Sequence, residues 1–394
     1  MEFEFDNKIK HKIRVVGIGG AGNNAIDNMI AAGLEGVTFV AANTDLQDLE
    51  YSLAPNKLQL GAELTRGLGC GSNPDIGRQA AMEDVAKIKE ILGESDMVFI
   101  TAGMGGGTGT GGAPVVAEAL KELDNPPLTV AVVTKPFPFE GSRRMRQAME
   151  GIQQLKEFAN TIIVIPNERL LGMAPRGCSI KDAFKMADDV LLQAVKGVSD
   201  IIQLPGLINV DFMDAKSVMS NQGQALMGTG IASGPDRATL AAQAAISSPL
   251  LDEISIKGAK GVLINISSSE NSMSLDEVND ACRLIQSEVD QEAQVIFGVA
   301  WDNSLADNLR ITVIATGIEK EDMLPRLQKD AGEHLASLDE VARRSREFER
   351  PTVERKRGAR SLAEFERPRY TKYESFIVSE EDLERPTFMR RKAD

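Results

Sequence analysis

Short apolar segments alternate with helix-like segments from residue 13 to about residue 203, and this alternation constrains the fold more than any other feature. The strand-like segments KIRVVGIG, VTFVAANTD, DMVFITAG, LTVAVVTKP and TIIVIPN have no regular polar face. The segments between them, such as NNAIDNMIAAG and APVVAEALKEL, have helical spacing. Strands that are apolar on both faces are typical of a parallel sheet covered by helices on both sides. The sequence therefore predicts an α/β fold in this region.

A long helical segment follows the alternating region. Ser179 is a suitable N-cap, and the apolar residues after it keep helical spacing up to a proline and a glycine, which predicts a long central helix over residues 179–203. Residues 207–317 read as a second, smaller α/β unit. The expected organisation is a first domain over residues 12–178, the central helix, and this second domain.

The composition changes after the second unit. Residues 318–394 contain 18 Lys and Arg and 18 Asp and Glu but few aliphatic residues. Such a segment cannot bury enough apolar area to offset the entropy of ordering, so we expect a disordered tail. A [DE]-[FL]-E-R-P core occurs three times in it, in the segments that start at residues 347, 364 and 382. Three copies favour short docking segments over drift.

Composition excludes several function classes. The net charge of −14 disfavours non-specific binding to nucleic acid or to an anionic membrane. The three scattered cysteines (Cys70, Cys178 and Cys282) indicate a reducing cytoplasm, and the two histidines (His11 and His334) cannot supply a metal cluster or a histidine-based triad. We also find no signal peptide and no apolar run long enough for a transmembrane helix.

The first glycine cluster, GIGGAGNNA, lies directly between a strand-like and a helix-like segment. Gly17, Gly19 and Gly22 satisfy G-x-G-x-x-G, the dinucleotide-binding pattern, and Asp45 follows the next strand where a ribose-binding acid would lie. Taken alone, this motif favours a nicotinamide-dependent oxidoreductase.

The second cluster, AGMGGGTGTGG over residues 102–112, also lies between a strand and a helix. Backbone N–H groups at the start of a helix bind phosphate, and Thr108 and Thr110 can add hydroxyl groups. Two such loops at one sheet edge indicate a single ligand with several phosphates. We expect the missing side chains to make room for those phosphates. Because the sequence has no P-loop lysine, a metal ion such as Mg²⁺ is expected to neutralise part of the charge.

Two pairs of charged residues could complete such a site. Glu140 and Arg144 lie one helical turn apart in the segment KPFPFEGSRR (residues 135–144), where they could hold a ribose and a phosphate. Asp211 and Asp214 are three residues apart at the start of a predicted helix. They could stabilise the N-terminus of the helix, or they could orient and polarise a water molecule; the residues alone leave both alternatives open.

The order and distances of several motifs resemble the FtsZ family of tubulin-like cell-division GTPases. These motifs are GIGGAGNNAI, AANTD, GLGCGSNP, GMGGGTGTG, KPFPFEG and NVDFMD, and the resemblance runs from about residue 12 to residue 317. It resumes at the C-terminus in DLERPTFMRR. It implies a tubulin/FtsZ-like fold, GTP and GDP as ligands with Mg²⁺, and GTP-dependent polymerisation into a division ring.

The resemblance also assigns roles to residues. The nucleotide would be bound by Gly20, Ala21, Gly22, Asn23, Asn24, Gly107, Thr108, Gly109, Glu140, Arg144, Asn167, Phe184 and Asp188. The carboxylate of Asp188 can accept hydrogen bonds from N1–H and the 2-amino group of guanine, an edge that adenine does not present. No residue is assigned as a metal ligand.

The resemblance changes the interpretation of Asp211 and Asp214. Both would enter the nucleotide pocket of the next subunit in a head-to-tail homopolymer, so that hydrolysis depends on assembly. The last tail segment would bind a membrane tether similar to FtsA or SepF through Leu383, Pro386, Phe388, Met389, Arg390 and Arg391. We therefore expect a cytoplasmic protein that assembles at mid-cell on the inner face of the membrane, without inserting into it and without binding nucleic acid.

Overall fold

The computed structural model describes residues 11–318 except residues 176, 204–205, 221–222, 252–255 and 271. The predictions for the tail, including its three repeated segments and the docking residues from Leu383 to Arg391, lie outside the described residues. Within the described ranges, no helix has both the length and the apolar content that a membrane span requires.

Six parallel strands form the first part of the sheet, in the order β3-β2-β1-β4-β5-β6. The strands are β1 (Ile13–Ile18), β2 (Val37–Asn43), β3 (Asn56–Gln59), β4 (Met97–Gly103), β5 (Leu128–Lys135) and β6 (Thr161–Pro166). The helices between them are α1 (Gly19–Ala31), α2 (Leu46–Tyr51), α3 (Ala62–Thr65), α4 (Pro74–Glu83), α5 (Val85–Leu92), α6 (Thr108–Lys121), α7 (Ser142–Phe158) and α8 (Asn167–Met173), with a 3₁₀ turn, η1 (Pro138–Glu140). The predicted parallel α/β sheet is confirmed.

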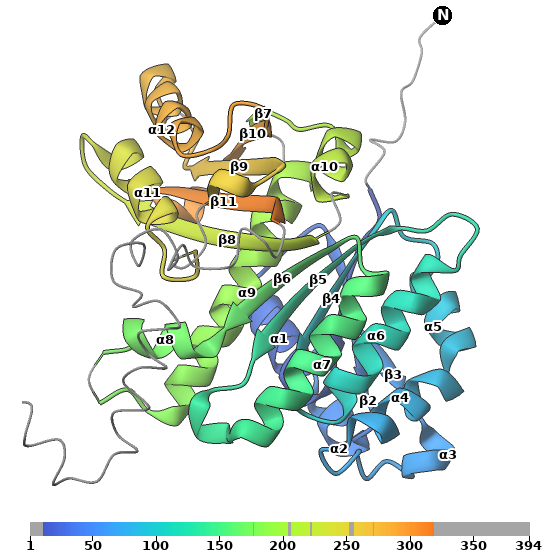
Figure 1. The fold of residues 1–394 in the computed structure, drawn as a ribbon. Helices are drawn as coiled ribbons and strands as arrows, with labels where there is room; N and C mark the ends of the chain where they lie inside the picture. Colours follow the sequence, from blue (N-terminus) through green and yellow to red (C-terminus); the bar gives the residue numbers. More distant parts are fainter. Residues whose placement is uncertain are drawn as a thin grey trace, which may run out of the picture. The chain divides into compact units, whose positions relative to one another are not determined.

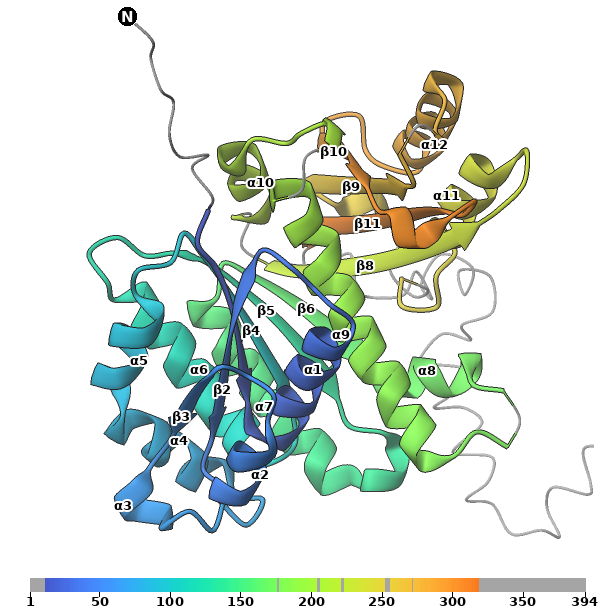
Figure 2. The ribbon, with the colours of Figure 1, turned by 180° about the vertical axis from the view of Figure 1, so that it is seen from behind.

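Helices cover both faces of these strands, as their apolar composition requires. Figure 1 shows α4, α5, α6 and α7 on the near face, and Figure 2 shows α1 and α9 on the opposite face. Adjacent residues of one strand enter different cores: Val15 packs into the core beneath α1 and α9, whereas Val16 packs into the core beneath α4 to α7. A strand buried in this way on both faces shows no alternation in its sequence.

The predicted central helix is α9 (Ile180–Gln203). The hydroxyl oxygen of Ser179 accepts a hydrogen bond from the backbone N–H of Asp182 at 3.1 Å, which is the expected N-terminal cap. Near the other end of the helix, the side-chain amide of Asn265 donates to the carbonyl of Gly197 at 3.1 Å. The helix therefore contacts both the parallel strands and the strands that follow in the sequence.

The second part of the sheet contains two strands, β7 and β8, that the sequence analysis did not predict. Its elements are β7 (Gly206–Ile208), α10 (Phe212–Met219), β8 (Gly223–Ala232), α11 (Arg237–Ile246), η2 (Ile256–Gly258), β9 (Gly261–Ser268), α12 (Leu275–Ser287), β10 (Gln294–Trp301), η3 (Asn303–Leu305) and β11 (Leu309–Ile318). The strand order continues β6-β8-β11-β9-β10-β7. Strand β8 pairs in parallel with β6 at three positions, so one sheet spans both parts. The proposed domain boundaries stay a prediction.

Candidate functional site

A pocket of about 280 Å³ lies where β1, β4 and β5 end and their helices begin. This is the edge at which open α/β sheets bind ligands. Both glycine clusters contribute to it, and α9 closes one side. The lining residues are Ile18, Gly19, Gly20, Ala21, Gly103, Met104, Gly106, Gly107, Thr108, Gly109, Thr134, Pro136, Glu140, Arg144, Asn167, Phe184, Ala187, Asp188 and Leu191.

Two helices begin at this pocket without a side-chain cap. Helix α1 starts after Ile18 and α6 starts after Gly107, and neither of these residues makes a capping hydrogen bond through a side chain. The first N–H groups of a helix have no partner inside the helix, and the helix dipole places partial positive charge there. The pocket therefore offers two sets of backbone donors to one anionic ligand.

The glycines of the second cluster serve two different purposes. A Cβ atom at Gly103 would lie 2.5 Å from the Cβ of Ala21, and one at Gly111 would lie 2.0 Å from the carbonyl oxygen of Pro74. A Cβ at Gly107 would lie 2.6 Å from the Cβ of Cys70, whereas one at Gly106 would have no atom within 4 Å. The expectation that phosphate alone excludes side chains here is therefore wrong: close packing within the protein accounts for several of these glycines.

A buried polar cluster packs against the second glycine cluster (residues 102–112), which is called the phosphate loop after its expected ligand. The hydroxyl groups of Thr44 and Thr108 are 2.7 Å apart, and the thiol of Cys70 lies 3.3 Å from the hydroxyl of Thr44. Nearby, the backbone N–H of Gly105 donates to the hydroxyl of Thr110 at 2.7 Å. Thr110 itself does not line the pocket, so its hydroxyl fixes the loop, while Thr108 faces the pocket.

Glu140 and Arg144 line the pocket and are already paired with each other. The guanidinium of Arg144 donates to Oε2 of Glu140 at 2.6 Å, and the backbone N–H of Phe137 donates to Oε1 at 2.8 Å. Both carboxylate oxygens therefore have a donor before a ligand is present. The carboxylate holds Arg144, about half exposed, at the pocket mouth.

Helix α9 supplies the wall opposite the phosphate loop. Phe184 is 41% exposed and packs edge-on against Phe137 and Phe139. One turn further on, burial raises the pKa of Asp188 to about 7, and the neighbouring carboxylate of Asp189 adds to the shift. Asn167, on α8, is buried, and its side-chain oxygen has no hydrogen-bond partner within the described part of the chain. An aromatic ring, an acceptor pair and an unsatisfied amide suit a planar base with N–H donors.

Three of the thirteen nucleotide residues expected from the resemblance do not line this pocket. Gly22 is buried against β4, where a Cβ would lie 2.6 Å from the carbonyl oxygen of Thr101. Asn24 is exposed on α1. Asn23 is buried, and neither polar atom of its side chain has a partner in the described chain. Asp45, the acid on which the oxidoreductase alternative depends, caps α2 by accepting from the N–H of Gln47 at 3.0 Å.

Asp211 and Asp214 are exposed and lie outside the pocket. Oδ1 of Asp211 accepts from the N–H of Met213 at 3.1 Å, so Asp211 is the N-cap of α10. The next residue, Phe212, stacks on His11, which directly precedes β1, with ring centroids 4.7 Å apart. The start of α10, which carries both carboxylates, therefore lies near the start of β1, whereas the pocket lies at the end of that strand.

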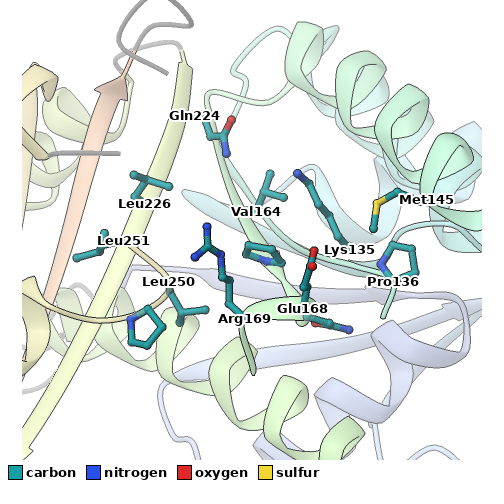
Figure 3. Close-up of a pocket in the computed structure, with 13 residues that line it drawn as sticks. Lys135, Pro136, Met145, Val164, Glu168, Arg169, Gln224, Leu226, Leu250 and Leu251 are labelled. Atoms are coloured by element: carbon teal, nitrogen blue, oxygen red, sulfur yellow. The ribbon is translucent and has the colours of Figure 1, made fainter. Parts of the chain in front are cut away.

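A larger cavity of about 650 Å³ adjoins the pocket and shares Pro136 and Asn167 with it. Figure 3 shows Lys135, Glu168 and Arg169 on the side of the parallel strands, facing Leu226 of β8 and the Leu250–Leu251 segment. Burial lowers the pKa of Lys135. The cavity contains neither glycine cluster nor Asp188, so the smaller pocket is the candidate for a nucleotide.

Sequence reasoning missed several pocket residues. Ala187 and Leu191 lie on the same face of α9 as Phe184 and Asp188, so helical periodicity could have found them. Met104 lies inside the second glycine cluster, whereas Thr134 carries no comparable signal. In the described ranges, no three His, Cys, Asp or Glu side chains are grouped to hold a metal ion.

The sequence matches two family models. Residues 12–175 match the GTPase domain of the tubulin/FtsZ family, and residues 223–319 match the C-terminal domain of the FtsZ family. Cell division protein FtsZ of Rickettsia conorii is 54% identical over 314 residues, which cover 79% of this chain and 69% of that protein. Cell division protein FtsZ of Azotobacter vinelandii is 46% identical over 395 residues, and the matched region covers 97% of this chain and 97% of that protein.

The fold is similar to that of solved structures. An FtsZ dimer from M. jannaschii superposes with a TM-score of 0.76 at 47% identity, over 80% of this chain and 90% of that one. The matched portion includes both parts of the sheet, because it is longer than either part alone.

Proposed function

The chain belongs to the FtsZ family of tubulin-like GTPases, and from this membership we infer that it binds and hydrolyses GTP and polymerises to form the cell-division ring. We propose further that each hydrolytic site is completed by the next subunit of a head-to-tail filament. The observation that carries this proposal is the separation of Asp211 and Asp214 from the nucleotide pocket.

The length of β1 gives the scale of that separation. Ile18, at the end of β1, lines the pocket, whereas the residues just before the strand contact α10. Six residues of strand span about 20 Å at roughly 3.3 Å per residue. A group that polarises the attacking water must lie within hydrogen-bond reach, about 3 Å or one water away. Within one chain Asp211 is far beyond that reach, which supports the proposal that a second copy supplies it.

Exposed apolar side chains at both ends support the same arrangement. Leu68 is 83% exposed and lies two residues from Cys70, beneath the phosphate loop. Met213 and Leu207, at the α10 end, are 63% and 67% exposed. Apolar surface at both ends favours stacking of identical subunits along one axis, which is a heterologous contact that generates an open filament.

The proposed reaction is attack of water on the γ-phosphorus, with cleavage of the bond to the oxygen that bridges it to GDP. The N–H groups of α1 and α6 and the guanidinium of Arg144 would stabilise charge on the phosphate oxygens, and the two carboxylates would accept hydrogen bonds from the attacking water. Mg²⁺ would neutralise charge that no lysine in the lining neutralises. Because no acidic cluster is present in the described chain, phosphate oxygens and the hydroxyl of Thr108 would hold it.

We also propose that the chain acts in the cytoplasm at mid-cell, on the inner face of the membrane. The last tail segment would bind an FtsA-like or SepF-like tether there. Its apolar residues, followed by Arg390 and Arg391, support this docking role.

Replacing Asp211 by asparagine tests the shared site. Asparagine caps a helix as well as aspartate does, so Asp211→Asn removes the negative charge without destabilising α10. We expect unchanged GTP binding, at least about a hundredfold slower phosphate release, and retained assembly. Asp280→Asn, an exposed acid on α12, is the control and should behave as wild type.

The concentration dependence of the rate is the second readout of this experiment. Wild-type specific activity should be low in dilute protein and rise above a threshold, measured by phosphate release together with light scattering. A specific activity that stays constant down to dilute protein, or an Asp211→Asn variant with normal turnover, would overturn the proposal.

A further inference from the structure

His11 is the residue that joins the first strand to the α10 segment. Its ring stacks on Phe212 with centroids 4.7 Å apart and an angle of 21° between the planes. Phe212 is buried and is the first residue of α10, directly after Asp211. The start of α10 therefore has two contacts: the N-capping hydrogen bond of Asp211 and the stack of Phe212 on His11.

His11 is itself held from two directions. Its carbonyl oxygen accepts from the side-chain amide of Gln203, the last residue of α9, at 2.8 Å. Its Nδ1 lies 3.9 Å from Oδ2 of Asp96, and the same oxygen accepts from the backbone N–H of Lys12 at 2.8 Å. These contacts hold the backbone of His11 before β1 and place a carboxylate beside its ring.

The α10 segment needs such a contact. The capping contact of Asp211 fixes only the conformation of the first helical turn. The position of the helix on the sheet depends on the contacts that its buried residues make. Phe212 is the first buried residue of the helix and directly follows Asp211. A side chain that acts in the pocket of another molecule must be placed to within a fraction of an ångström, because small misplacements reduce rates steeply.

We propose that His11 is a positioning residue for GTP hydrolysis: by stacking on Phe212 it sets the start of α10, so that the carboxylate of Asp211 reaches the nucleotide of the neighbouring subunit. This inference rests on the proposed function, because it assumes that Asp211 acts in trans. His11 itself touches neither nucleotide nor water in the reaction. It acts in the subunit that donates the carboxylate, not in the one that binds the GTP.

The proposal predicts a specific split between binding and turnover. Stacked aromatic pairs contribute beyond their buried area, and losing this one should lower turnover per assembled subunit by about 3- to 10-fold. The affinity of dilute protein for GTP should be unchanged, because His11 lies at the opposite edge from the pocket. Assembly with the slowly hydrolysed analogue GMPCPP should also be unchanged. A residue needed only for folding would lower all three quantities together.

The test compares His11→Ala, His11→Phe and Lys12→Ala in the full-length chain. Phenylalanine keeps the stack without the imidazole and should restore turnover to within about twofold of wild type. Lys12 is exposed and pairs with Glu94, away from α10, so its replacement should leave turnover unchanged. Phosphate release is measured on sedimented filaments, and GTP affinity on dilute protein.

A double-mutant cycle identifies the route of the effect. His11→Ala should lower turnover much less in a Phe212→Leu background than in wild type, since the stack is already absent there. Equal effects in both backgrounds, normal turnover of His11→Ala, or failure of His11→Phe to restore turnover would each overturn the proposal. Asp211→Asn separates this inference from its premise: if that variant turns over normally, the shared site is wrong; if it is inactive while His11→Ala is normal, only the positioning role is wrong.

Discussion

Lowering the pH from 8 to 6 should weaken GTP binding through Asp188 by about tenfold. Burial places the pKa of this carboxyl at about 7 in the ligand-free protein. About nine-tenths of the molecules therefore carry the carboxylate at pH 8, and about one-tenth at pH 6. Only the carboxylate can accept both N1–H and the 2-amino group of guanine, so the nucleotide selects the charged form. Binding should release a proton, and affinity should rise with pH.

The variant Asp188→Asn is the control for this experiment. It also measures how much the contact between Asp188 and guanine contributes to affinity. Its amide presents one acceptor oxygen and one NH₂ donor in place of two acceptor oxygens, so it cannot match both N–H donors of guanine. The loss of a hydrogen bond to a charged group costs about 1.5–3 kcal/mol, or roughly 10- to 150-fold in affinity. The terminal phosphate of GTP also titrates near this range, so the decisive quantity is the difference in pH slope between wild type and Asp188→Asn. Fluorescence titration of both proteins at pH 6, 7 and 8 measures it.

The same substitution should have the opposite effect on the stability of the ligand-free protein. A carboxyl whose pKa is raised on folding from 3.8 to about 7 destabilises the folded state at pH 8, by at most about 4 kcal/mol. This cost falls as the pH falls from 7 towards 3.8, because the folded protein takes up the proton first. We therefore expect a higher Tm for Asp188→Asn than for wild type at pH 8 and a smaller difference at pH 5. Parallel pH slopes in binding together with equal Tm values at pH 8 would refute the reasoning.

Two further predictions concern the phosphate loop and the tail. Gly106→Ala should lose GTP affinity without a change in Tm, since the added Cβ meets no protein atom within 4 Å, whereas Gly111→Ala, with a Cβ 2.0 Å from the oxygen of Pro74, should lose about 1–3 kcal/mol of stability in thermal unfolding. Normal GTP affinity of Gly106→Ala would mean that no phosphate lies on that residue. Deleting residues 382–394 should leave GTPase activity intact and abolish co-sedimentation with vesicles carrying an FtsA-like or SepF-like tether. A matching loss of activity would argue against a separate docking role.

Local signals in the sequence were sufficient for most of the first part of the fold. Uninterrupted apolar strands such as β1 and β4 report burial on both faces, and the cap at Ser179 marks the start of α9 within one residue. Strand β8 was missed because its sequence, GQALMGTGIA, mixes glycine and threonine with no alternation. Its glycines fit the close approach of α11: a Cβ at Gly228 would lie 2.1 Å from the oxygen of Ala245. Gly228 and Ala245 are distant in the sequence, so their contact depends on tertiary packing, which a local sequence pattern does not predict.

For the candidate site as well, the sequence was sufficient to place some residues but not others. Gly20 and Thr108 lie in the two glycine clusters, Asp188 was assigned by the resemblance, and all three line one pocket. The mutual pairing of Glu140 and Arg144 depends instead on the conformation of η1. The sequence also left open whether Asp211 caps a helix or acts on water. It caps α10 in the structure, and its exposed position is compatible with the second role as well. The raised pKa of Asp188 had no sequence signal, because it comes from burial between elements that are distant in the chain.

The placement of the pocket and of Asp211 at opposite edges of the sheet has a consequence for the ends of a filament. If each hydrolytic site needs two subunits, a filament of n subunits contains n − 1 complete sites. One terminal subunit then presents its nucleotide to solvent with no partner carboxylate, and its GTP persists until another subunit arrives. The opposite terminus presents carboxylates with nothing to act on. The two ends of a filament built from identical molecules would therefore differ in nucleotide content. The time for which each bound GTP has been open to hydrolysis would depend on when the neighbouring subunit was added.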